Sequence, residues 1–255
     1  MKQRISILGC GWLGMPLAFE LIQNGYHVNG STTSNNKLNK LRSKGVMPFM
    51  VDISKRDVDV SNFLFSDVLI IAIPSKKIND FKHLIAQIEK SETRKVIFIS
   101  STSVYPNTNG IVTENTITKK SSLSEIEQLF KLNTIFKSTI IRFGGLFGHD
   151  RKPGNFIKVD KKIENPEGFI NFVHRDDCVR IIDQVIACDT WNETLNACAD
   201  THPKRREFYK KEMKKIGRLE PIFNENSTND YKIVSNEKLK TLLGYKFEYS
   251  NLMNY

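Results

Sequence analysis

The sequence has few cysteines, and none of them lies in a spacing typical of a metal site or a redox pair. Four cysteines occur in 255 residues, at positions 10, 178, 188 and 198, without a Cys-x-x-Cys pair. Paired or metal-bound cysteines are therefore not expected. We predict reduced thiols with a structural role in a cytoplasmic protein, and no metal site.

The sequence also lacks a long hydrophobic run. No stretch approaches the roughly 20 apolar residues of a membrane span. The apolar run near the N-terminus is too short for the core of a signal peptide. We therefore expect no association with a membrane.

Acidic residues are outnumbered by basic ones, which gives a formal net charge of +10 and a pI of about 9.3. This balance suits anionic ligands. The densest basic stretch runs from Lys204 to Lys215, and Phe208 and Met213 within it have helical spacing. The stretch predicts the solvated face of an amphipathic helix. A nucleic-acid surface is the alternative, but no zinc-finger, homeodomain or RNP-like pattern occurs, and we do not expect nucleic acid as a partner.

Strand and helix signals alternate over the first 150 residues or so. Such alternation is typical of a parallel sheet with crossover helices. We predict an α/β fold: a Rossmann doubly wound parallel sheet with helices on both faces, followed by a small C-terminal α/β lobe. The predicted domains are 1–148 for the Rossmann domain and 149–255 for the substrate lobe, with segments at about 169–198 returning to the Rossmann core.

The predicted strands and helices follow from apolar runs and from helical spacing. Strands are expected at 4–8, 26–29, 46–51, 67–73, 95–99, 139–143, 169–173 and 194–197. Helices are expected after the first glycine cluster, through 38–41, around 81–88, and at 123–132, 176–188, 204–216 and 235–244.

A glycine cluster directly after the first strand predicts a dinucleotide site. The sequence Gly9-Cys10-Gly11-Trp12-Leu13-Gly14 lies between that strand and a helix that ends at Asn24-Gly25. Gly9 can make the turn, Gly11 lets the backbone approach a pyrophosphate, and Gly14 lets the helix lie close on the strand. A glycine turn that binds no ligand is the alternative. Cys10 would lie beside the phosphates and would then differ from the other thiols.

Further cofactor contacts are expected where later strands end, because ligands bind at the carboxyl ends of parallel strands. Ala72-Ile73-Pro74 ends the fourth strand, and Ser100 follows the fifth. At the end of the second strand an NAD site would carry an acid, yet neither Asp nor Glu occurs between Glu20 and Asp52. That position holds Ser31, Thr32 and Thr33, with Lys37 nearby.

Hydroxyls and an ammonium group can accept a 2′-phosphate, whereas a carboxylate would repel it. The cofactor predicted from this segment is therefore NADP rather than NAD. The alternative is that these hydroxyls only cap the next helix, which would leave the cofactor choice open.

Four motifs in order resemble the extended short-chain dehydrogenase/reductase group, which includes NAD-dependent epimerases and dehydratases. They are the glycine cluster, the strand-five motif at 99–105, the strand-six exit at 142–148, and Phe172 to Asp177, with Arg175 where valine is usual. The short chain, the form of the glycine cluster and residues 205–209 are most similar to the atypical YeeZ-like branch.

This resemblance implies a catalytic serine but leaves the usual proton donor missing. Ser101, four residues before Tyr105, matches the serine that hydrogen-bonds the substrate oxygen. The group's Tyr-x-x-x-Lys motif is absent, since no tyrosine occurs between Tyr105 and Tyr209. Tyr105, Lys119 and Glu125 are candidates for the proton transfer. The alternative interpretation of Tyr105 is a packing role.

His174 precedes Asp176-Asp177 in the fourth motif, and two interpretations apply to it. One is a metal-binding or acid/base role for the histidine. The simpler one, which we adopt, is that an aspartate stabilises the start of the next helix.

The sequence thus leaves two functions open. One is an NADP-dependent oxidoreductase or epimerase-like enzyme on an anionic or nucleotide-linked small molecule, bound at the carboxyl ends of the strands under the C-terminal lobe. The other is a sensor or regulatory module that binds NADP without turnover. Because extended relatives often form dimers through helices that flank the sheet, a homodimer is a further expectation.

Overall fold

Residues 3–158 and 161–255 are described by a computed structural model, and their contacts group them into two units. Unit 1 consists of Met1–Ser100, Lys120–Ile141 and Ile182–Thr194, and unit 2 of Ser101–Lys119, Arg142–Ile181 and Leu195–Tyr255. Residues 101–119 and 142–148, which the sequence analysis gave to the first domain, therefore belong with the C-terminal region. The two units are defined by contacts in space, and each unit consists of three segments of the chain.

A seven-stranded sheet has the order β10-β7-β5-β4-β1-β2-β3. The pairs β1–β2, β1–β4, β2–β3 and β4–β5 are parallel. The strand order reverses at β1, so that β2 and β4 flank it, as in a doubly wound sheet. The strands are β1 (Arg4–Leu8), β2 (His27–Thr32), β3 (Met47–Met50), β4 (Val68–Ile71), β5 (Lys95–Ser101), β7 (Lys137–Phe143) and β10 (Thr194–Ala197).

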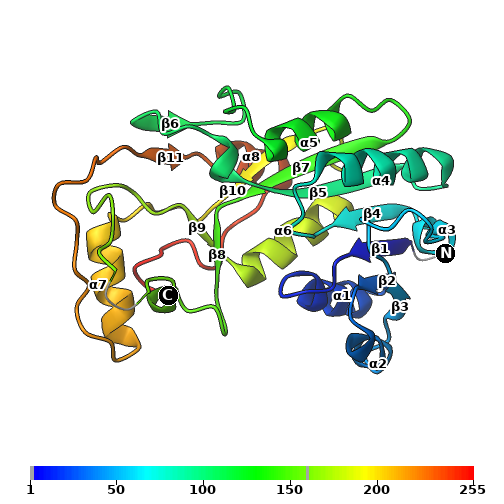
Figure 1. Ribbon diagram of the computed structural model, residues 1–255, viewed down its shortest axis with the longest axis horizontal. Coiled ribbons are helices and arrows are strands. Elements are labelled where there is room, and N and C mark those ends of the chain that lie inside the picture. The colour runs from blue at the N-terminus through cyan, green and yellow to red at the C-terminus, as the bar shows by residue number, and fades with distance from the viewer. Residues whose placement is uncertain (1–2, 159–160) are drawn as a thin grey trace. The chain divides into compact units, whose positions relative to one another are not determined.

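The central strands are apolar because helices cover both of their faces. All four residues of β4 are buried, and Ile5, Ile7 and Leu8 of β1 are at most 1% exposed. In Figure 1, α4 (Ile78–Lys90) and α5 (Ser122–Lys131) lie side by side over one face, and α1 (Gly14–Gln23) lies on the other. The predicted Rossmann α/β fold is confirmed.

The remaining helices of the first 100 residues are short. They are the 3₁₀ turn η1 (Asn35–Lys37), α2 (Leu38–Arg42) and α3 (Ser61–Leu64). The sequence analysis missed α3, a single turn. Helix α1 ends as predicted, with Asn24 as C-cap and Gly25 at φ 88°.

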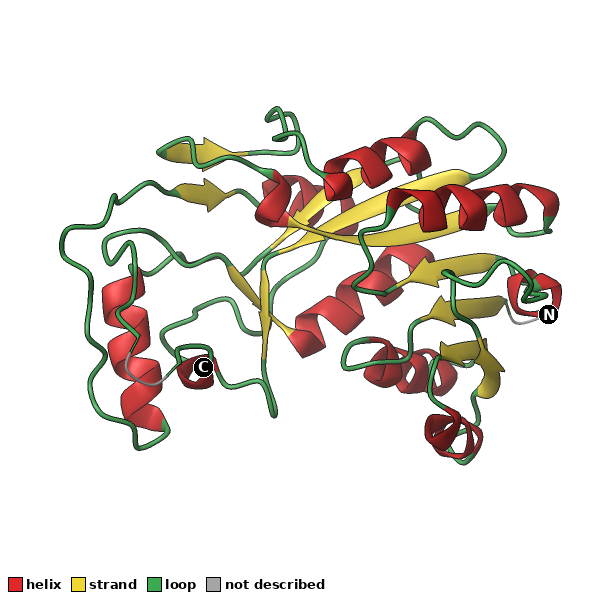
Figure 2. Cartoon of the chain, viewed as in Figure 1, coloured by secondary structure: helices red, strands yellow, loops and turns green. Residues whose placement is uncertain are grey.

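Unit 2 has short regular elements joined by long loops (Figure 2). Two parallel pairs, β6 (Gly110–Val112) with β11 (Lys232–Val234) and β8 (Gly145–Phe147) with β9 (Phe172–His174), each have three residues per strand. Except for β9, these strands were not predicted. The other elements are η2 (Thr102–Val104), η3 (Pro153–Asn155), α7 (Arg205–Lys215) and α8 (Glu237–Leu243); α6 (Arg175–Ala187) begins in this unit.

An apolar cluster forms the core around α7. Phe147 and Phe208 are fully buried in it, and Leu252 brings the C-terminal segment into the same cluster. Phe172 packs edge-on against Phe208, with ring centroids 5.5 Å apart. The lobe after residue 148 therefore has a hydrophobic core of its own.

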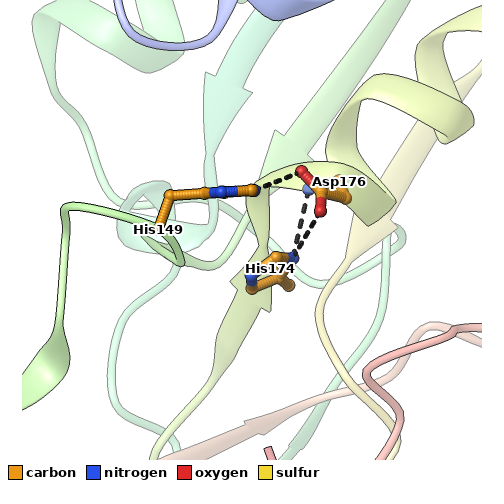
Figure 3. Close-up of side chains that lie close together, drawn as sticks. All are labelled: His149, His174 and Asp176. Carbon is orange, nitrogen blue, oxygen red and sulfur yellow. Dashed lines mark hydrogen bonds and ion pairs between the residues drawn. The ribbon is translucent and has the colours of Figure 1, made fainter.

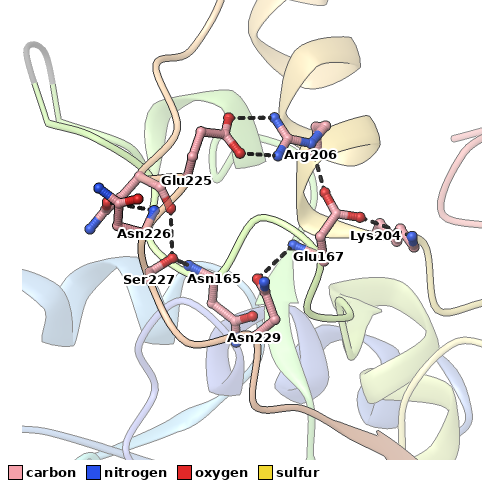
Figure 4. Close-up of polar contacts among 9 residues, drawn as sticks. Asn165, Glu167, Lys204, Arg206, Glu225, Asn226, Ser227 and Asn229 are labelled. Carbon is pink, nitrogen blue, oxygen red and sulfur yellow. Dashed lines mark hydrogen bonds and ion pairs between the residues drawn. The ribbon is translucent and has the colours of Figure 1, made fainter.

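The basic residues of α7 are tied to acids and chain carbonyls within unit 2 (Figure 4). Arg206 donates two hydrogen bonds to the carboxylate of Glu225 and one to Glu167. Lys204 donates to Glu167 as well, at 2.9 Å, and Lys215 donates to the carbonyl oxygen of Tyr255 at 2.7 Å. These contacts give the basic stretch a structural role, in line with the predicted amphipathic helix.

Within residues 3–158 and 161–255, no helix combines the length and apolarity needed to cross a bilayer.

Candidate functional site

The glycine turn after β1 requires glycine at two positions for different reasons. Gly9 has φ +100°, and a Cβ there would lie 2.6 Å from Cγ2 of Ile73 and 2.8 Å from the carbonyl oxygen of Ala72. A Cβ on Gly14 would lie 2.2 Å from the carbonyl oxygen of Gly9. The turn thus packs against the end of β4 and directly under the start of α1.

Gly11 is different, because a Cβ there would meet nothing within 4 Å. Its backbone borders open space, which is the feature needed for close approach of a phosphate. The amides of Gly9, Cys10 and Gly11 donate to Ser31 and Gly9, and the Met15 amide donates to the carbonyl oxygen of Gly11. The amides of Leu13 and Gly14, at the start of α1, lie at the positive end of the helix dipole. The turn therefore fits a dinucleotide pyrophosphate.

A cavity of about 450 Å³ adjoins this turn within unit 1. Its size lies within the range of small-molecule sites. Ten predicted cofactor residues line it, from the glycine turn and the ends of β2 and β4: Gly9, Cys10, Gly11, Ser31, Thr32, Thr33, Lys37, Ala72, Ile73 and Pro74.

The hydroxyls at the end of β2 have two kinds of role. The Ser31 hydroxyl accepts a hydrogen bond from the Gly9 amide at 2.9 Å, and the residue is 1% exposed, so Ser31 braces the glycine turn. Thr32 Oγ1 accepts from the amide of Ser34 at 3.1 Å and can still donate its own proton. Thr33 and Lys37 are exposed. A bound anion would therefore meet Thr33 and Lys37 more readily than Ser31.

Eight lining residues were not among the predicted cofactor residues. Leu8 ends β1 and Ser34 follows β2, four follow β3 (Val51, Asp52, Ile53 and Ser54), and Ser75 and Lys77 follow β4. The Asp52 carboxylate accepts from the amide and the hydroxyl of Ser54, and these hydrogen bonds lower its pKa, so it is ionised at neutral pH. The rule that ligands lie at carboxyl ends of strands could have identified these residues, had it been applied to β3.

Four predicted cofactor residues lie outside the lining of this cavity, as far as the described chain goes: Trp12, Leu13, Gly14 and Ser100. Leu13 is 7% exposed, and Gly14 serves the packing of α1. The Ser100 hydroxyl donates to a carboxylate oxygen of Glu127 at 2.5 Å, and both side chains are buried. Ser100 thereby joins β5 to α5.

Cys10 has the character of a buried thiol in spite of its place in the turn. Its sulfur would lie 2.8 Å from a Cβ on Gly30, so the glycine makes room for it. Cys10 is 3% exposed, and burial raises the pKa of its thiol to about 12. Such a thiol is protonated and unreactive at neutral pH.

The two candidate catalytic residues follow β5 and differ in exposure. Ser101 is partly exposed, and its hydroxyl accepts from the amide of Ser103 at 3.1 Å. Tyr105 is fully buried; its hydroxyl accepts from Arg142 at 2.6 Å and donates to Asn196 at 2.8 Å. Burial raises the pKa of Tyr105, and the Arg142 charge opposes that rise. This environment matches a packing role for Tyr105, which was the alternative to a catalytic role in the sequence analysis.

The two other proton-transfer candidates, Lys119 and Glu125, are exposed.

Three polar residues of the fourth motif, His174, Asp176 and Asp177, make different contacts. Asp177 is buried, and its carboxylate accepts from the Tyr245 hydroxyl and from the amides of Glu248 and Tyr249. Asp177 lies in the first turn of α6 and, through these hydrogen bonds, also holds the C-terminal segment in place. His174 is 3% exposed, and burial lowers its pKa. Asp176 lies between His174 and His149.

Comparison with known proteins supports this assignment of the first unit. Residues 4–123 match the model of the NAD-binding domain of 6-phosphogluconate dehydrogenase. Protein YeeZ of Escherichia coli (strain K12) is 28% identical over 265 residues, which cover 97% of this chain and 96% of that protein.

Solved structures share the fold over nearly the whole chain. A conserved protein of unknown function from Silicibacter pomeroyi aligns over 99% of this chain and 96% of its own, with a TM-score of 0.82 and 18% identity. A UDP-glucuronic acid 4-epimerase from Bacillus cereus, solved with NAD, aligns over 98% and 95%, with a TM-score of 0.78 and 19% identity. The fold is thus that of NAD-dependent epimerases, and the matches support a nicotinamide cofactor.

Proposed function

We propose that the protein binds NADP in the cavity of unit 1 and acts as an oxidoreductase or epimerase-like enzyme of the extended short-chain dehydrogenase/reductase type, in its YeeZ-like branch. The observation that carries the proposal is the Gly9–Gly14 turn, whose backbone at Gly11 borders open space at the head of α1. The 28% identity to YeeZ along the whole chain supports the branch.

The residues of this chain would hold the cofactor by its phosphates and its adenosine ribose. The amides of Leu13 and Gly14, at the start of α1, bind the pyrophosphate. Thr33 and Lys37 bind a 2′-phosphate, with Lys77 as a second cation at the rim. The nicotinamide, when bound, supplies hydride transfer.

Asp52 lies in the same cavity and is the main argument for NAD. Its carboxylate would repel a 2′-phosphate if the two came close, whereas it could accept a hydrogen bond from a ribose hydroxyl. Structural neighbours with NAD named as ligand share under 20% identity, so they do not decide the point. We favour NADP because no acid follows β2 and because Lys37 and Lys77 both line the cavity.

For the substrate we propose an anionic, nucleotide-linked small molecule. Neighbours of this fold bind UDP-glucose or UDP-glucuronic acid according to their descriptions. The net charge of +10 suits such a ligand. Ser101, at the carboxyl end of β5, would donate a hydrogen bond to the substrate oxygen.

The second candidate function is an NADP-binding module without turnover. The specific observation in its favour is the burial of Tyr105, whose hydroxyl is engaged by Arg142 and Asn196. No tyrosine occurs between Tyr105 and Tyr209. Loss of a positioned general acid or base costs about 10²- to 10⁴-fold in rate, so an enzyme of this type would be slow.

Turnover with and without Ser101 distinguishes the two functions. NADPH oxidation is followed by its absorbance with nucleotide-sugar and simple carbonyl substrates, in wild type, in Ser101→Ala and in Ser103→Ala. The Ser103 side chain is exposed, and the variant keeps the amide that Ser101 accepts from, which makes it a matched control. Loss of turnover in Ser101→Ala alone supports the enzyme. Tight NADPH binding without oxidation of any substrate supports the module.

A further inference from the structure

Three side chains of kinds that ligate metals meet in unit 2, and none of them lines the cofactor cavity of unit 1. His149 follows β8, His174 ends β9, and Asp176 is in the first turn of α6. Figure 3 shows the Asp176 carboxylate in contact with both imidazole rings. His149 Nε2 lies 2.7 Å from Asp176 Oδ1, and His174 Nδ1 lies 3.7 Å from Asp176 Oδ2. One ligand atom from each residue falls within 4.8 Å of the others.

The backbone is shaped to bring the two imidazoles to this carboxylate. His149 has φ +53°, which is uncommon for a residue with a side chain. Gly148 before it has φ +116°, and a Cβ there would lie 2.2 Å from His174 Nε2. The Gly148 amide accordingly closes a tight turn to the carbonyl oxygen of Arg151. Only glycine lets this turn pass over the buried ring.

The orientation of the His174 ring directs one nitrogen lone pair toward Asp176. Its Nδ1 accepts a hydrogen bond from the Asp176 amide at 3.3 Å, so Nδ1 carries no proton. The ring is fixed by stacking on Tyr249, with centroids 3.6 Å apart, and by the edge contact of Phe147. A bound ion would replace the Asp176 amide as the partner of this lone pair, and the fixed ring would keep its orientation.

We propose that His149, His174 and Asp176 bind one divalent transition-metal ion, with Zn²⁺ as the best fit. Two imidazole nitrogens and one carboxylate suit Zn²⁺, and three protein ligands leave a position for water. With bonds of about 2.0–2.1 Å, a tetrahedral ion separates its ligand atoms by about 3.3 Å. The observed separations are 2.7 Å to Asp176 Oδ1 and 3.7 Å to Asp176 Oδ2, and all ligand atoms lie within 4.8 Å of one another, so small side-chain rotations would reach that value.

Exposure and nearby charge are compatible with entry of the ion. The side chains of His149 and Asp176 are 45% and 31% exposed, so small rotations can separate the close pair and leave a solvent path. Arg175 is the neighbouring cation that opposes binding. Its Nε lies 3.9 Å from Asp176 Oδ1, in an ion pair that a bound cation would compete with.

This metal site does not rest on the cofactor proposal, since its residues belong to unit 2 and the cavity to unit 1. The test uses full-length protein without a histidine tag, treated with a chelator and then dialysed. Cys188 is exposed and could bind zinc adventitiously, so all variants carry Cys188→Ser. Binding of ZnCl₂ is measured by calorimetry, and the visible absorption of Co²⁺ reports the ligand geometry.

We expect one ion per chain and a tetrahedral Co²⁺ spectrum. His149→Asn, chosen because asparagine tolerates a positive φ, and Asp176→Asn should each weaken zinc binding by about 100-fold. His27→Ala removes an exposed imidazole elsewhere and should leave the affinity unchanged. Absence of saturable binding in the parent, or equal affinity in His149→Asn and the parent, would overturn the site. Circular dichroism checks that each variant is folded.

Discussion

Units 1 and 2 bury polar groups of different kinds. In unit 1 most of the buried polar side chains are hydroxyls, such as those of Ser6, which donates to Phe63 at 2.5 Å, and Thr93, which donates to Leu64 at 2.6 Å; the carboxylates of Asp80 and Glu127 are buried there as well. In unit 2 they include the charged or titratable side chains of Arg142, His174, Asp177 and Glu212, all at most 3% exposed.

The difference shows how each unit is stabilised. Apolar strands fill the core of unit 1, and its hydroxyl contacts each contribute about 0.5–1.5 kcal/mol. In unit 2 the buried charges join segments far apart in the chain, such as Asp177 with Tyr245 and Arg142 with Tyr105. Loss of one partner there leaves a charged or polar group buried without a hydrogen bond, which costs more.

The largest expected effect comes from removing a buried carboxylate in unit 2. Asp177→Ala leaves the Tyr245 hydroxyl and two amides without their acceptor, and should lower the free energy of unfolding by about 3–5 kcal/mol. Asp80→Ala is the matched change in unit 1, where the partner Arg56 is half-exposed and can turn to water. We expect a loss of about 1 kcal/mol there. Urea unfolding measures both, and equal losses would contradict the comparison.

A smaller effect is expected from a single hydroxyl in unit 2. Tyr105→Phe removes the acceptor of the buried Arg142 and the donor to Asn196, and should cost about 1.5–3 kcal/mol. The control is Tyr26→Phe in unit 1, at a half-buried ring, where we expect less than about 0.5 kcal/mol. Thermal and urea unfolding of the pair give the test. A Tyr105→Phe protein as stable as the control would show that the network contributes little.

The pH dependence of stability should also come mainly from unit 2. Burial lowers the pKa of His202 in the folded chain below its usual 6.5. At pH values between the folded-state pKa and 6.5, the unfolded chain therefore binds more protons than the folded one. The free energy of unfolding should therefore fall as the pH drops below about 6.5, by at most about 1.4 kcal/mol per pH unit for one group.

His202→Asn should reduce that slope, as measured by urea unfolding at pH 7.5 and 5.5. Burial raises the pKa values of Asp177 and Glu212, which act with the opposite sign, but at lower pH. A slope identical in the variant and the wild type would exclude His202 as a contributor.

Fast thiol reactivity should come from unit 1, because Cys188 lies in that unit and both cysteines of unit 2 are buried. Cys10, Cys178 and Cys198 are buried, and Cys188 is exposed. With a pKa of about 12, Cys10 has a thiolate fraction of about 10⁻⁴ at pH 8. A disulfide reagent should therefore modify one thiol per native chain quickly and four after denaturation. A second fast thiol that is lost in Cys10→Ser would contradict the buried state of Cys10.

Local signals in the sequence were sufficient for unit 1. The turn at Gly9–Gly14 and the apolar run that becomes β4 were both predicted, because a tight turn and a buried strand restrict residue type over a few neighbouring positions. Strand β5 extends further than predicted, to Ser101.

Contacts between distant residues could not be predicted in the same way. Gly110–Val112 pairs with Lys232–Val234, and three residues in each strand are too few for a periodic pattern. The sequence likewise gave no sign that Tyr105 would meet Arg142. Asp52 was missed from the cavity for another reason, since it follows β3, a strand whose end had not been considered. Lys77 was missed because the cofactor contacts predicted after β4 stopped at Pro74.

Binding of NADPH to wild type and Gly11→Ala, measured by calorimetry on full-length protein, tests the central claim most directly. The added Cβ meets no protein atom within 4 Å, so the variant should keep the wild-type melting temperature while filling the space for a phosphate. The account predicts NADPH binding at least about tenfold tighter than NADH binding in wild type, and loss of both in Gly11→Ala. No NADPH uptake by folded wild type at millimolar ligand, or unchanged affinity in the variant, would contradict it.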